Sequence, residues 1–249
     1  MTIRGTLTRR INAAAERALD MALPSLCAGC GREGQVLCRD CAPALDGRLH
    51  LPPGGVLGLP GDIPEPLVQI EWCASFSGVT RRALHQLKYS GDRRLAVPLG
   101  RAVARRWRRA GQGGEILVPV PASPDRVRER GYDQAALIAR AAGAALNMPV
   151  RDDLLERARL TTAQFDLDRS ARAHNVRGAF RIRRDTRLGS GASFHAGRRP
   201  AEADHEVDAP WIILVDDVLT TGSTLAACAE TLLEAGAFAV SAVTVARER

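Results

Sequence analysis

The sequence predicts an α/β protein, with a parallel sheet covered by helices on both faces and preceded by a small cysteine-rich module. From residue 116 to the end, apolar segments of strand length alternate with segments of helical periodicity, which is typical of a covered parallel sheet. Four cysteines in two close pairs lie within residues 27–41. The 249 residues suit one main domain with a small attachment, because domains are typically about 100–200 residues long.

The first half of the chain contributes one predicted strand and three predicted helices. Residues 7–23 show an amphipathic pattern that predicts a helix docked on the main domain. Residues 68–76 alternate between apolar and other side chains, which predicts a strand with one buried face. Residues 79–89 and 95–110 have the apolar spacing of helices.

A linker is predicted between the cysteine module and the main domain. Residues 46–66 contain five prolines and five glycines, a composition that favours a connecting segment. The chain therefore divides into residues 1–45 with the N-terminal helix and the cysteine module, the linker 46–66, and a main domain at 67–249.

The second half of the chain supplies most of the predicted sheet. Strands are predicted at 116–120, 179–182, 211–215 and 239–245, and helices at 133–146 and 222–235. The run 211–215 is continuously apolar, as expected of a strand buried on both faces. Residues 184–209 are polar and aperiodic, which predicts a flexible surface insertion.

The composition excludes several classes of protein. Apolar residues make up 45% of the chain and charged residues 25%, which is ordinary for a globular protein and argues against wholesale disorder. No apolar run approaches the roughly 18 residues needed to cross a bilayer. The N-terminus shows no signal-peptide pattern, and Glu16 and Asp20 argue against a transit peptide. We therefore expect a soluble, cytoplasmic protein with no membrane span.

The net charge of +7 is concentrated in two stretches. Residues 81–130 hold thirteen basic and four acidic residues, and residues 157–184 hold eight arginines and two aspartates. Such stretches can bind a phosphate-rich ligand or nucleic acid, or they can simply form a solvated helix face. Aromatic residues make up only 4% of the chain, which argues against strong stacking on single-stranded DNA.

The cysteine module has the spacing of a zinc site. Cys27 and Cys30 are separated by two residues, as are Cys38 and Cys41. Each pair can turn two thiolates toward one point, and two pairs complete a tetrahedral site. Two disulfides are the first alternative, but they conflict with the lack of an export signal. Redox chemistry is the second, and it normally needs only one such pair. We therefore expect structural Zn²⁺.

A second candidate site follows the predicted strand 211–215. Asp216 and Asp217 come directly after this strand, at the end where open α/β sheets bind ligands. A short loop then opens the helix at 222–235, and free N–H groups at a helix N-terminus together with hydroxyls can hold an anion. Carboxylates beside a phosphate cradle suit a sugar phosphate. The loop is not a Walker A motif, because the G-x-x-x-x-G-K pattern is absent.

Residues 212–224 resemble the 5-phosphoribosyl-1-pyrophosphate (PRPP) loop of type I phosphoribosyltransferases. The resemblance implies a type I phosphoribosyltransferase-like fold, in which Asp216 and Asp217 hold the 2′- and 3′-hydroxyls of the ribose. It also implies that the loop surrounds the 5′-phosphate. The loop residues are Thr220, Thr221, Gly222, Ser223 and Thr224.

Further segments are similar to those of the ComF/GntX family, which also carries an N-terminal four-cysteine module. The matching segments are 87–89, 118–121, 126–134, 159–164 and 175–180. The similarity runs from about residue 22 to the end, is weak over the linker and is absent over 184–209. One departure is Asp133, where the family more usually shows Asn. Membership implies a role in DNA uptake and natural competence and, in some members, in gluconate use.

Phosphoribosyl transfer would require groups that neutralise the departing pyrophosphate. Ala122 and Ser123 lie at a predicted strand end and are candidates to meet the pyrophosphate through backbone N–H groups. Arg128 and Arg130 are further candidates, because each guanidinium can bind phosphate through two N–H groups. The alternative is that these two arginines form a solvated basic turn. Mg²⁺ bound with PRPP would offset further charge. We predict that a nucleobase-binding or lid region includes Arg159, Thr161 and Gln164. The alternative is that these residues only cap a helix or lie at the surface. No catalytic residue is assigned.

Lys88 is an outlier of composition. Of the 35 basic residues, 34 are arginines and one is this lysine. Wherever only a positive charge is needed, this chain uses arginine. The single lysine is therefore explained if its site needs a compact ammonium group, which is smaller than a guanidinium. We expect Lys88 to bind phosphate or pyrophosphate, and a chance lysine at a helix end is the alternative.

Two functions stay open at this point. The first, which we favour, is a phosphoribosyltransferase, a pentosyl-transferring glycosyltransferase acting on an unknown acceptor. The second is a non-catalytic module that senses nucleotide or binds single-stranded DNA through the zinc module and the basic surface. The expected partners are PRPP or a related ribose phosphate, single-stranded DNA, and proteins of the competence machinery.

Overall fold

The computed structural model describes residues 25–53, 66–158, 178–183 and 209–248. Besides residues 54–65 of the predicted linker, three sets of sequence predictions fall wholly or mostly outside these residues. They are the helix at 7–23, the insertion at 184–209, and the candidates Arg159, Thr161 and Gln164.

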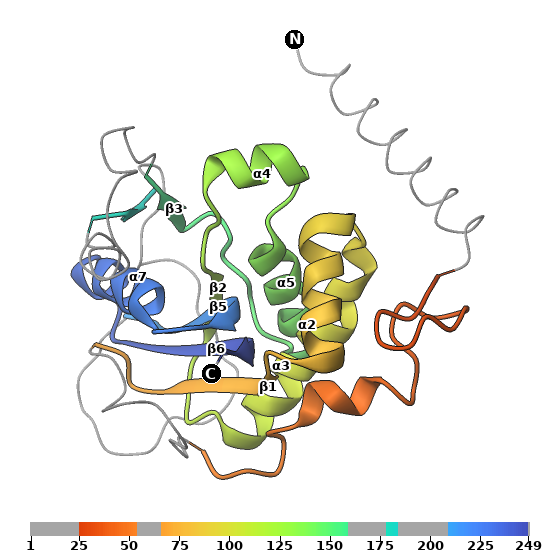
Figure 1. Cartoon of the computed structure of the whole chain (residues 1–249). Coiled ribbons are helices and arrows are strands. Elements are labelled where there is room, and N and C mark those ends of the chain that lie inside the picture. The colour runs from red at the N-terminus through yellow and green to blue at the C-terminus, as the bar shows by residue number, and fades with distance from the viewer. Residues whose placement is uncertain (1–24, 54–65, 159–177, 184–208, 249) are drawn as a thin grey trace.

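The main sheet has four parallel strands in the order β1-β6-β5-β2 (Figure 1). The strands are β1 (Ile70–Ser75), β2 (Ile116–Pro119), β5 (Trp211–Leu219) and β6 (Ala239–Arg247). Helix α7 lies on one face, and α2, α3 and α5 lie on the other. This arrangement confirms the predicted parallel sheet with helices on both faces. The strand predicted at 179–182 forms, but it lies outside this sheet, in a separate antiparallel pair.

The helices are short and amphipathic. The side opposite α7 carries α2 (Gly78–His85), the π-helical turn η2 (Gln86–Ser90), α3 (Ala96–Ala110) and α5 (Gln134–Leu146), and α7 spans Ser223–Glu234. Two 3₁₀ turns, η1 (Ala42–Asp46) and η3 (Arg93–Leu95), complete this layer. None of the helices that the structure describes has the length and apolar character needed to cross a bilayer.

The alternation of side chains along β5 separates two apolar cores. Ile213 and Val215 pack with α3 and α5, whereas Ile212 and Leu214 pack with α7. Successive residues of a strand point to opposite faces, so this alternation also decides the environment of every residue that follows along β5.

Strand β5 is longer than the sequence predicts. Its apolar run ends at Val215, but main-chain pairing with β6 continues through Asp216 and Leu219. Backbone hydrogen bonding does not depend on side-chain polarity, so the apolar run marks only the buried part of the strand. Asp216 and Asp217 therefore lie within β5, just beyond the last residue that pairs with β2.

Strand β1 is buried on both faces, whereas the alternation at 68–76 predicts one buried face. Ile70 and Trp72 pack on the α7 side and Cys73 packs on the other. The buried carboxylate of Glu71 accepts a hydrogen bond from Arg106 of α3 at 2.6 Å. The ion pair makes a polar side chain compatible with burial, which the alternation pattern does not reveal.

Two small elements appear where the sequence analysis expects none. Helix α4 (Pro124–Arg130) follows β2, and β3 (Leu155–Arg157) pairs antiparallel with β4 (Phe180–Ile182). Figure 1 shows α4 and β3 at the same end of the molecule.

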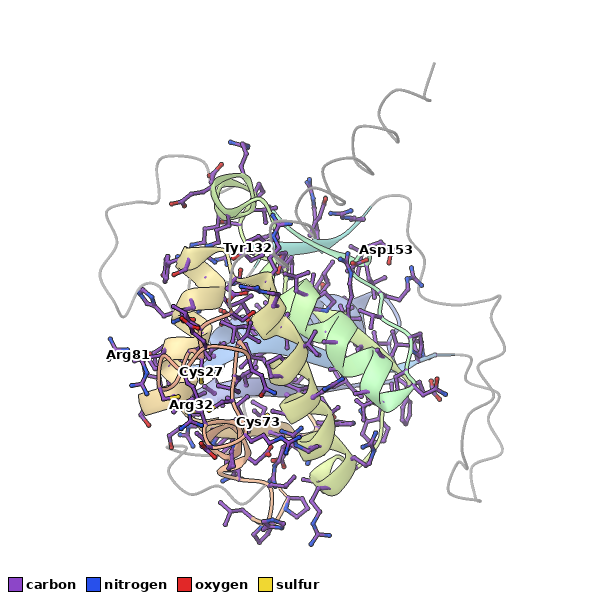
Figure 2. The ribbon with its side chains drawn as sticks, turned by 90° about the vertical axis from the view of Figure 1, so that its right-hand side faces the viewer. Cys27, Arg32, Cys73, Arg81, Tyr132 and Asp153 are labelled. Atoms are coloured by element: carbon purple, nitrogen blue, oxygen red, sulfur yellow. The ribbon has the colours of Figure 1, made fainter. Side chains whose placement is uncertain are left out.

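The cysteine segment packs directly on the main domain. Arg82 of α2 donates to the carbonyl oxygens of Ala28 and Gly29 at 3.3 and 2.8 Å. Figure 2, which looks onto the helical layer, labels Cys27 of this segment. The start of the expected linker is also packed, since Asp46 accepts hydrogen bonds from Arg105 at 2.9 Å.

Candidate functional site

The connection from β5 to α7 has a tight turn at Gly222. This residue has φ 81°, a left-handed conformation that glycine adopts at little cost, and it immediately precedes the helix. No side chain caps the helix from this position. The hydroxyls of Thr221 and Ser223 lie 3.0 Å apart, and Thr220 and Thr221 are exposed. The N–H of Ser223 donates to the Thr221 hydroxyl at 3.4 Å, and the N–H groups that follow it at the start of the twelve-residue helix α7 are available to an anion, together with nearby hydroxyls.

Each of the two adjacent aspartates uses one carboxylate oxygen within the protein. Oδ1 of Asp216 accepts the N–H of Asp217 at 2.7 Å. Oδ2 of Asp217 lies 2.7 Å from Nζ of Lys88 and accepts a hydrogen bond of 3.3 Å from Gln134. Within the described ranges, Oδ2 of Asp216 and Oδ1 of Asp217 have no partner. One oxygen of each carboxylate can therefore accept a hydroxyl of a ligand.

The structure brings Lys88 to Asp217 across the molecule. Lys88 lies on the π-helical turn η2, and such turns occur frequently at functional sites. Its side chain is 21% exposed and that of Asp217 is 8% exposed. In the structure this lysine neutralises a carboxylate, a role that the sequence does not indicate.

A buried glutamine extends this contact to α4, and the sequence analysis misses it. Besides donating to Asp217, Gln134 accepts a hydrogen bond of 2.9 Å from Arg130. The guanidinium of Arg130 also lies over the ring of Tyr89, 5.2 Å from its centroid. Gln134 lies in the segment 126–134 that resembles the ComF/GntX family, and this resemblance is the signal that the sequence carries.

Asp133 is a second missed residue. It caps α5 by accepting the N–H groups of Ala135 and Ala136 on Oδ1, at 2.9 and 3.2 Å. Its other oxygen accepts the N–H of Ala122 at 2.8 Å. Both oxygens accept, which asparagine with its single acceptor oxygen cannot reproduce. An aspartate directly before a helical segment is a capping signal that the sequence carries.

The remaining sequence candidates are distributed around α4. The N–H of Ala122 is engaged by Asp133, and Ser123 immediately precedes α4. Arg128 is exposed and pairs with Asp125 on the same helix at 3.2 Å. None of these three forms a hydrogen bond or an ion pair with Asp216 or Asp217 in the part of the chain that the structure describes.

Burial raises the pKa of the Asp216 carboxyl well above its usual range. The negative charge of Asp217 raises this pKa further, while the Asp217 N–H and the charge of Lys88 lower it. Burial likewise raises the pKa of Asp133, against the three N–H groups that it accepts. Ionisation of Asp216 and of Asp133 is therefore unfavourable in this site.

The raised pKa of Asp216 predicts how stability depends on pH. A carboxyl group with a folded-state pKa above its unfolded value of about 4 stabilises the protein at low pH, and that stability is lost as pH rises through the folded-state pKa. We expect Asp216→Asn to melt at a higher temperature than the unaltered protein at pH 8. The difference should vanish toward pH 4, because the asparagine oxygen still accepts the Asp217 N–H.

Thermal melts between pH 4 and 8 check this expectation. Asp153→Asn is the control, because a hydrogen bond from Arg151 lowers the pKa of Asp153 and gives the opposite sign. A lower melting temperature for Asp216→Asn than for the unaltered protein at pH 8 would contradict the assignment.

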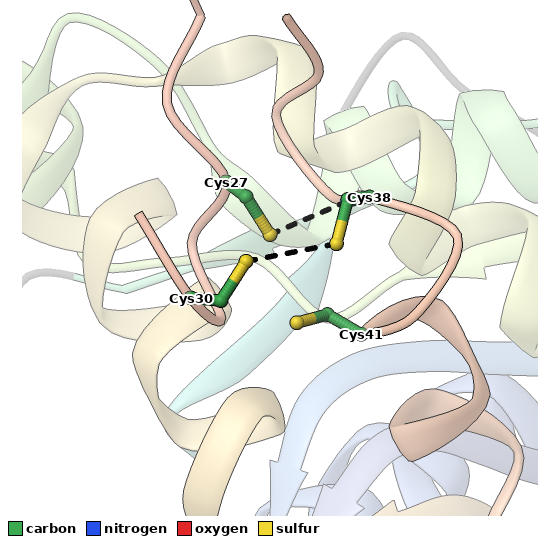
Figure 3. A group of neighbouring side chains, drawn as sticks. All are labelled: Cys27, Cys30, Cys38 and Cys41. Atoms are coloured by element: carbon green, nitrogen blue, oxygen red, sulfur yellow. Dashed lines mark hydrogen bonds between the residues drawn. The ribbon is translucent and has the colours of Figure 1, made fainter. Parts of the chain in front are cut away.

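The four predicted cysteines form one cluster (Figure 3). Cys27, Cys30, Cys38 and Cys41 have sulfur atoms that all lie within 4.8 Å of one another. A Cβ on Gly29 would lie 2.5 Å from the sulfur of Cys41, so the turn admits only glycine. The donor set of four sulfur atoms fits a tetrahedral metal ion.

The surroundings of Cys27 favour the thiolate form of its side chain. Burial raises its pKa, but the N–H groups of Cys38, Cys30 and Gly29 outweigh this effect and lower the pKa to about 6. All six cysteines of the chain are free thiols, so the disulfide alternative is absent from the structure. The cluster can hold a metal ion.

Comparison with known proteins identifies similar chains of related length. The DNA utilization protein YhgH of Escherichia coli (strain K12) is 30% identical over 222 residues, which are 87% of this chain and 86% of that protein. Competence protein F of Haemophilus influenzae is 29% identical over 201 residues, 80% of this chain and 74% of that protein. No family model matches the chain.

A solved structure of glutamine PRPP amidotransferase from B. subtilis, complexed with ADP and GMP, aligns with 59% of this chain and 25% of that one. The identity is 18% and the TM-score is 0.35, which is too low to carry an argument about the site.

Proposed function

Because this chain belongs to the ComF/GntX family, we propose that it binds PRPP or a related ribose phosphate at the β5–α7 connection. The observation that carries the proposal is the pair of adjacent carboxylates, each with one oxygen that has no partner among the described residues, beside the N-terminus of helix α7. The oxygens of Asp216 and Asp217 accept the ribose hydroxyls. The hydroxyls and N–H groups of residues 220–224 hold the 5′-phosphate.

We propose that the bound molecule transfers its phosphoribosyl group to an acceptor. Bond breaking at C1 creates positive charge on the sugar and negative charge on the pyrophosphate, so the protein must stabilise both and exclude water. Lys88 and Gln134 hold Asp217 in place through its Oδ2, which leaves Oδ1 directed to the ligand. Mg²⁺ supplied with PRPP would neutralise part of the pyrophosphate charge.

The cysteine cluster is proposed to hold structural Zn²⁺. Four thiolates leave no open position for a water molecule or a substrate, and sites of this kind stabilise a fold rather than catalyse. In this protein the metal would fix the segment that packs on α2.

Calorimetric titration with Mg²⁺·PRPP and with ribose 5-phosphate tests the proposed ligand. Saturable binding with one site per chain is the expected result. Release of pyrophosphate in the presence of a nucleobase panel then tests transfer. A protein that binds neither compound has no ribose-phosphate site.

Replacement of Lys88 tests whether an ammonium group is required. Lys88→Arg places a planar and larger guanidinium in a mostly buried position. The oxygen that it would contact, Oδ2 of Asp217, also accepts a hydrogen bond from Gln134. We expect Lys88→Arg and Lys88→Met to weaken PRPP binding at least about tenfold, or about 1.4 kcal/mol. Titration calorimetry measures the affinity, and Arg101→Lys, at an exposed position of α3, is the control. If Lys88→Arg binds PRPP with the affinity of the unaltered protein, the site does not require an ammonium group and the lysine is present by chance.

We also propose that the chain acts in DNA uptake in the cytoplasm, with competence-machinery proteins as partners, because its relatives are named for DNA utilization and competence. Tyr89 is 66% exposed and lies beneath the guanidinium of Arg130, an arrangement that favours stacking of a base. Titration of a single-stranded oligonucleotide at low and high salt tests this second function. Competition by PRPP would show that both ligands share one site, as the nucleotide-sensing alternative requires.

A further inference from the structure

The side-chain amide of Gln134 joins α4 to the proposed ribose site. Gln134 is the first residue of α5 and is buried. Its Oε1 accepts a hydrogen bond of 2.9 Å from Nη1 of Arg130, and its Nε2 donates to Oδ2 of Asp217 at 3.3 Å. The opposite orientation of the amide would turn its oxygen toward a carboxylate and its NH₂ group toward a guanidinium, and neither pair can form a hydrogen bond. Arg130 therefore decides which end of the amide meets Asp217.

The guanidinium of Arg130 is itself held against η2. Arg130 ends α4, is half-buried, and lies over the ring of Tyr89, 5.2 Å from its centroid. Tyr89 directly follows Lys88, whose Nζ lies 2.7 Å from Oδ2 of Asp217. Two paths therefore lead from Arg130, one through the Gln134 amide and one through η2. Both paths end at the same carboxylate oxygen of β5.

A further contact ties η2 to the junction between α4 and α5. Tyr132 lies in this junction, and its hydroxyl donates a hydrogen bond to the carbonyl oxygen of Leu87 in η2. The guanidinium of Arg93 lies over the ring of Tyr132, 4.7 Å from its centroid. Arg130 and Tyr89 thus meet between two segments that are already joined. This lowers the conformational entropy that is lost when the long arginine side chain is held in one place.

The two donors on Oδ2 of Asp217 set the direction of its other oxygen. The torsion that turns a carboxylate is broad, so a single donor leaves the plane of the group variable. Lys88 and Gln134 both contact Oδ2, and together they fix this plane and the direction of Oδ1. A ribose hydroxyl needs an acceptor at a fixed place, so loss of one donor weakens the contact with the ligand although the donor does not touch the ligand.

We propose that Arg130 is a positioning residue of the ribose site, which acts through Gln134 on Asp217 and not on the phosphates of the ligand. The proposal rests on the proposed function and takes the place of the direct pyrophosphate contact that the sequence predicts for this arginine. The two roles differ in the ligands that they affect. A positioning residue acts on the ribose contact, so it matters equally for PRPP and for ribose 5-phosphate, whereas a pyrophosphate ligand matters for PRPP alone.

Titration calorimetry with Mg²⁺·PRPP and with ribose 5-phosphate tests this role in Arg130→Met, Gln134→Leu and the double variant. We expect each single variant to bind both compounds about tenfold more weakly, which is the effect of one lost hydrogen bond to a charged group. The double variant should bind less than about twofold more weakly than either single variant, because both changes break the same contact.

Two further variants separate positioning from a general effect of the substitution. Arg130→Lys keeps a donor for Oε1 of Gln134 and should recover most of the affinity for both compounds. Arg128→Met is the matched control, because Arg128 is exposed on the same helix and pairs with Asp125. This control should bind both compounds normally.

Four results would overturn the role of Arg130. They are normal binding by Arg130→Met, a loss confined to PRPP, losses that add in the double variant, and binding by Arg130→Lys that is as weak as that of Arg130→Met. The NMR signals of the Gln134 side-chain amide, identified by their absence in Gln134→Leu, separate this proposal from the function on which it rests. If the unaltered protein binds neither compound, the proposed function fails. The positioning contact then stands if Arg130→Met shifts these signals and Arg128→Met does not, and it falls otherwise.

Discussion

The double variant Asp216→Asn, Asp217→Asn is expected to lose PRPP binding by at least about 100-fold, or about 2.7 kcal/mol, while it stays folded. The two free carboxylate oxygens are the proposed partners of the ribose hydroxyls, and a neutral amide oxygen accepts such hydrogen bonds far more weakly than a carboxylate. Titration calorimetry with Mg²⁺·PRPP measures the loss.

The fold of this double variant is expected to survive for an electrostatic reason. The two adjacent negative charges disfavour each other, and burial raises the pKa of Asp216. Removing both charges relieves that cost but also removes the carboxylate that pairs with Lys88, so the change in melting temperature is the balance of these two opposing effects.

A matched control is available at Asp152 and Asp153. These are also adjacent aspartates, and they pair with Arg140 and Arg151. The variant Asp152→Asn, Asp153→Asn removes the same charge and should bind PRPP normally. Unchanged PRPP affinity in the Asp216 and Asp217 variant would remove the ribose-site assignment.

Loss of zinc is expected to lower the melting temperature of the entire protein. Purified protein should contain one zinc per chain, since the four sulfur atoms form one cluster. Cys27, Leu37 and Cys38 belong to the apolar core that also contains residues of α2 and α3, so metal binding and core packing are coupled. We expect Cys30→Ser to lose the metal and to melt about 5–10 °C lower, which corresponds to a few kcal/mol in a chain of this size.

Cys30 is the informative cysteine because its side chain is exposed. Its replacement removes a ligand with little loss of packing, so the change in stability reports on the metal. Cys73→Ala is the control for metal content, because this buried thiol lies outside the cluster and should leave one zinc per chain. Less than about a tenth of an equivalent of zinc in well-folded unaltered protein would contradict the prediction.

The sequence by itself predicts the features that depend on short spacings. The two cysteine pairs, the aspartates at the end of the apolar run 211–215, and the glycine before α7 are all specified within a few residues. The parallel sheet is also predictable, because strand and helix patterns alternate along the chain. Local patterns suffice here because capping, turn and metal-ligand geometry are local.

Only the tertiary structure decides how these pieces meet. The order β1-β6-β5-β2 places Asp217 where Lys88 and Gln134 both reach its Oδ2. Figure 1 shows α4 and β3 at one end of the molecule, and β3 pairs there with β4. These contacts join side chains far apart in the sequence, and no periodicity encodes such pairing. The position of each partner follows from the packing of whole strands and helices against one another.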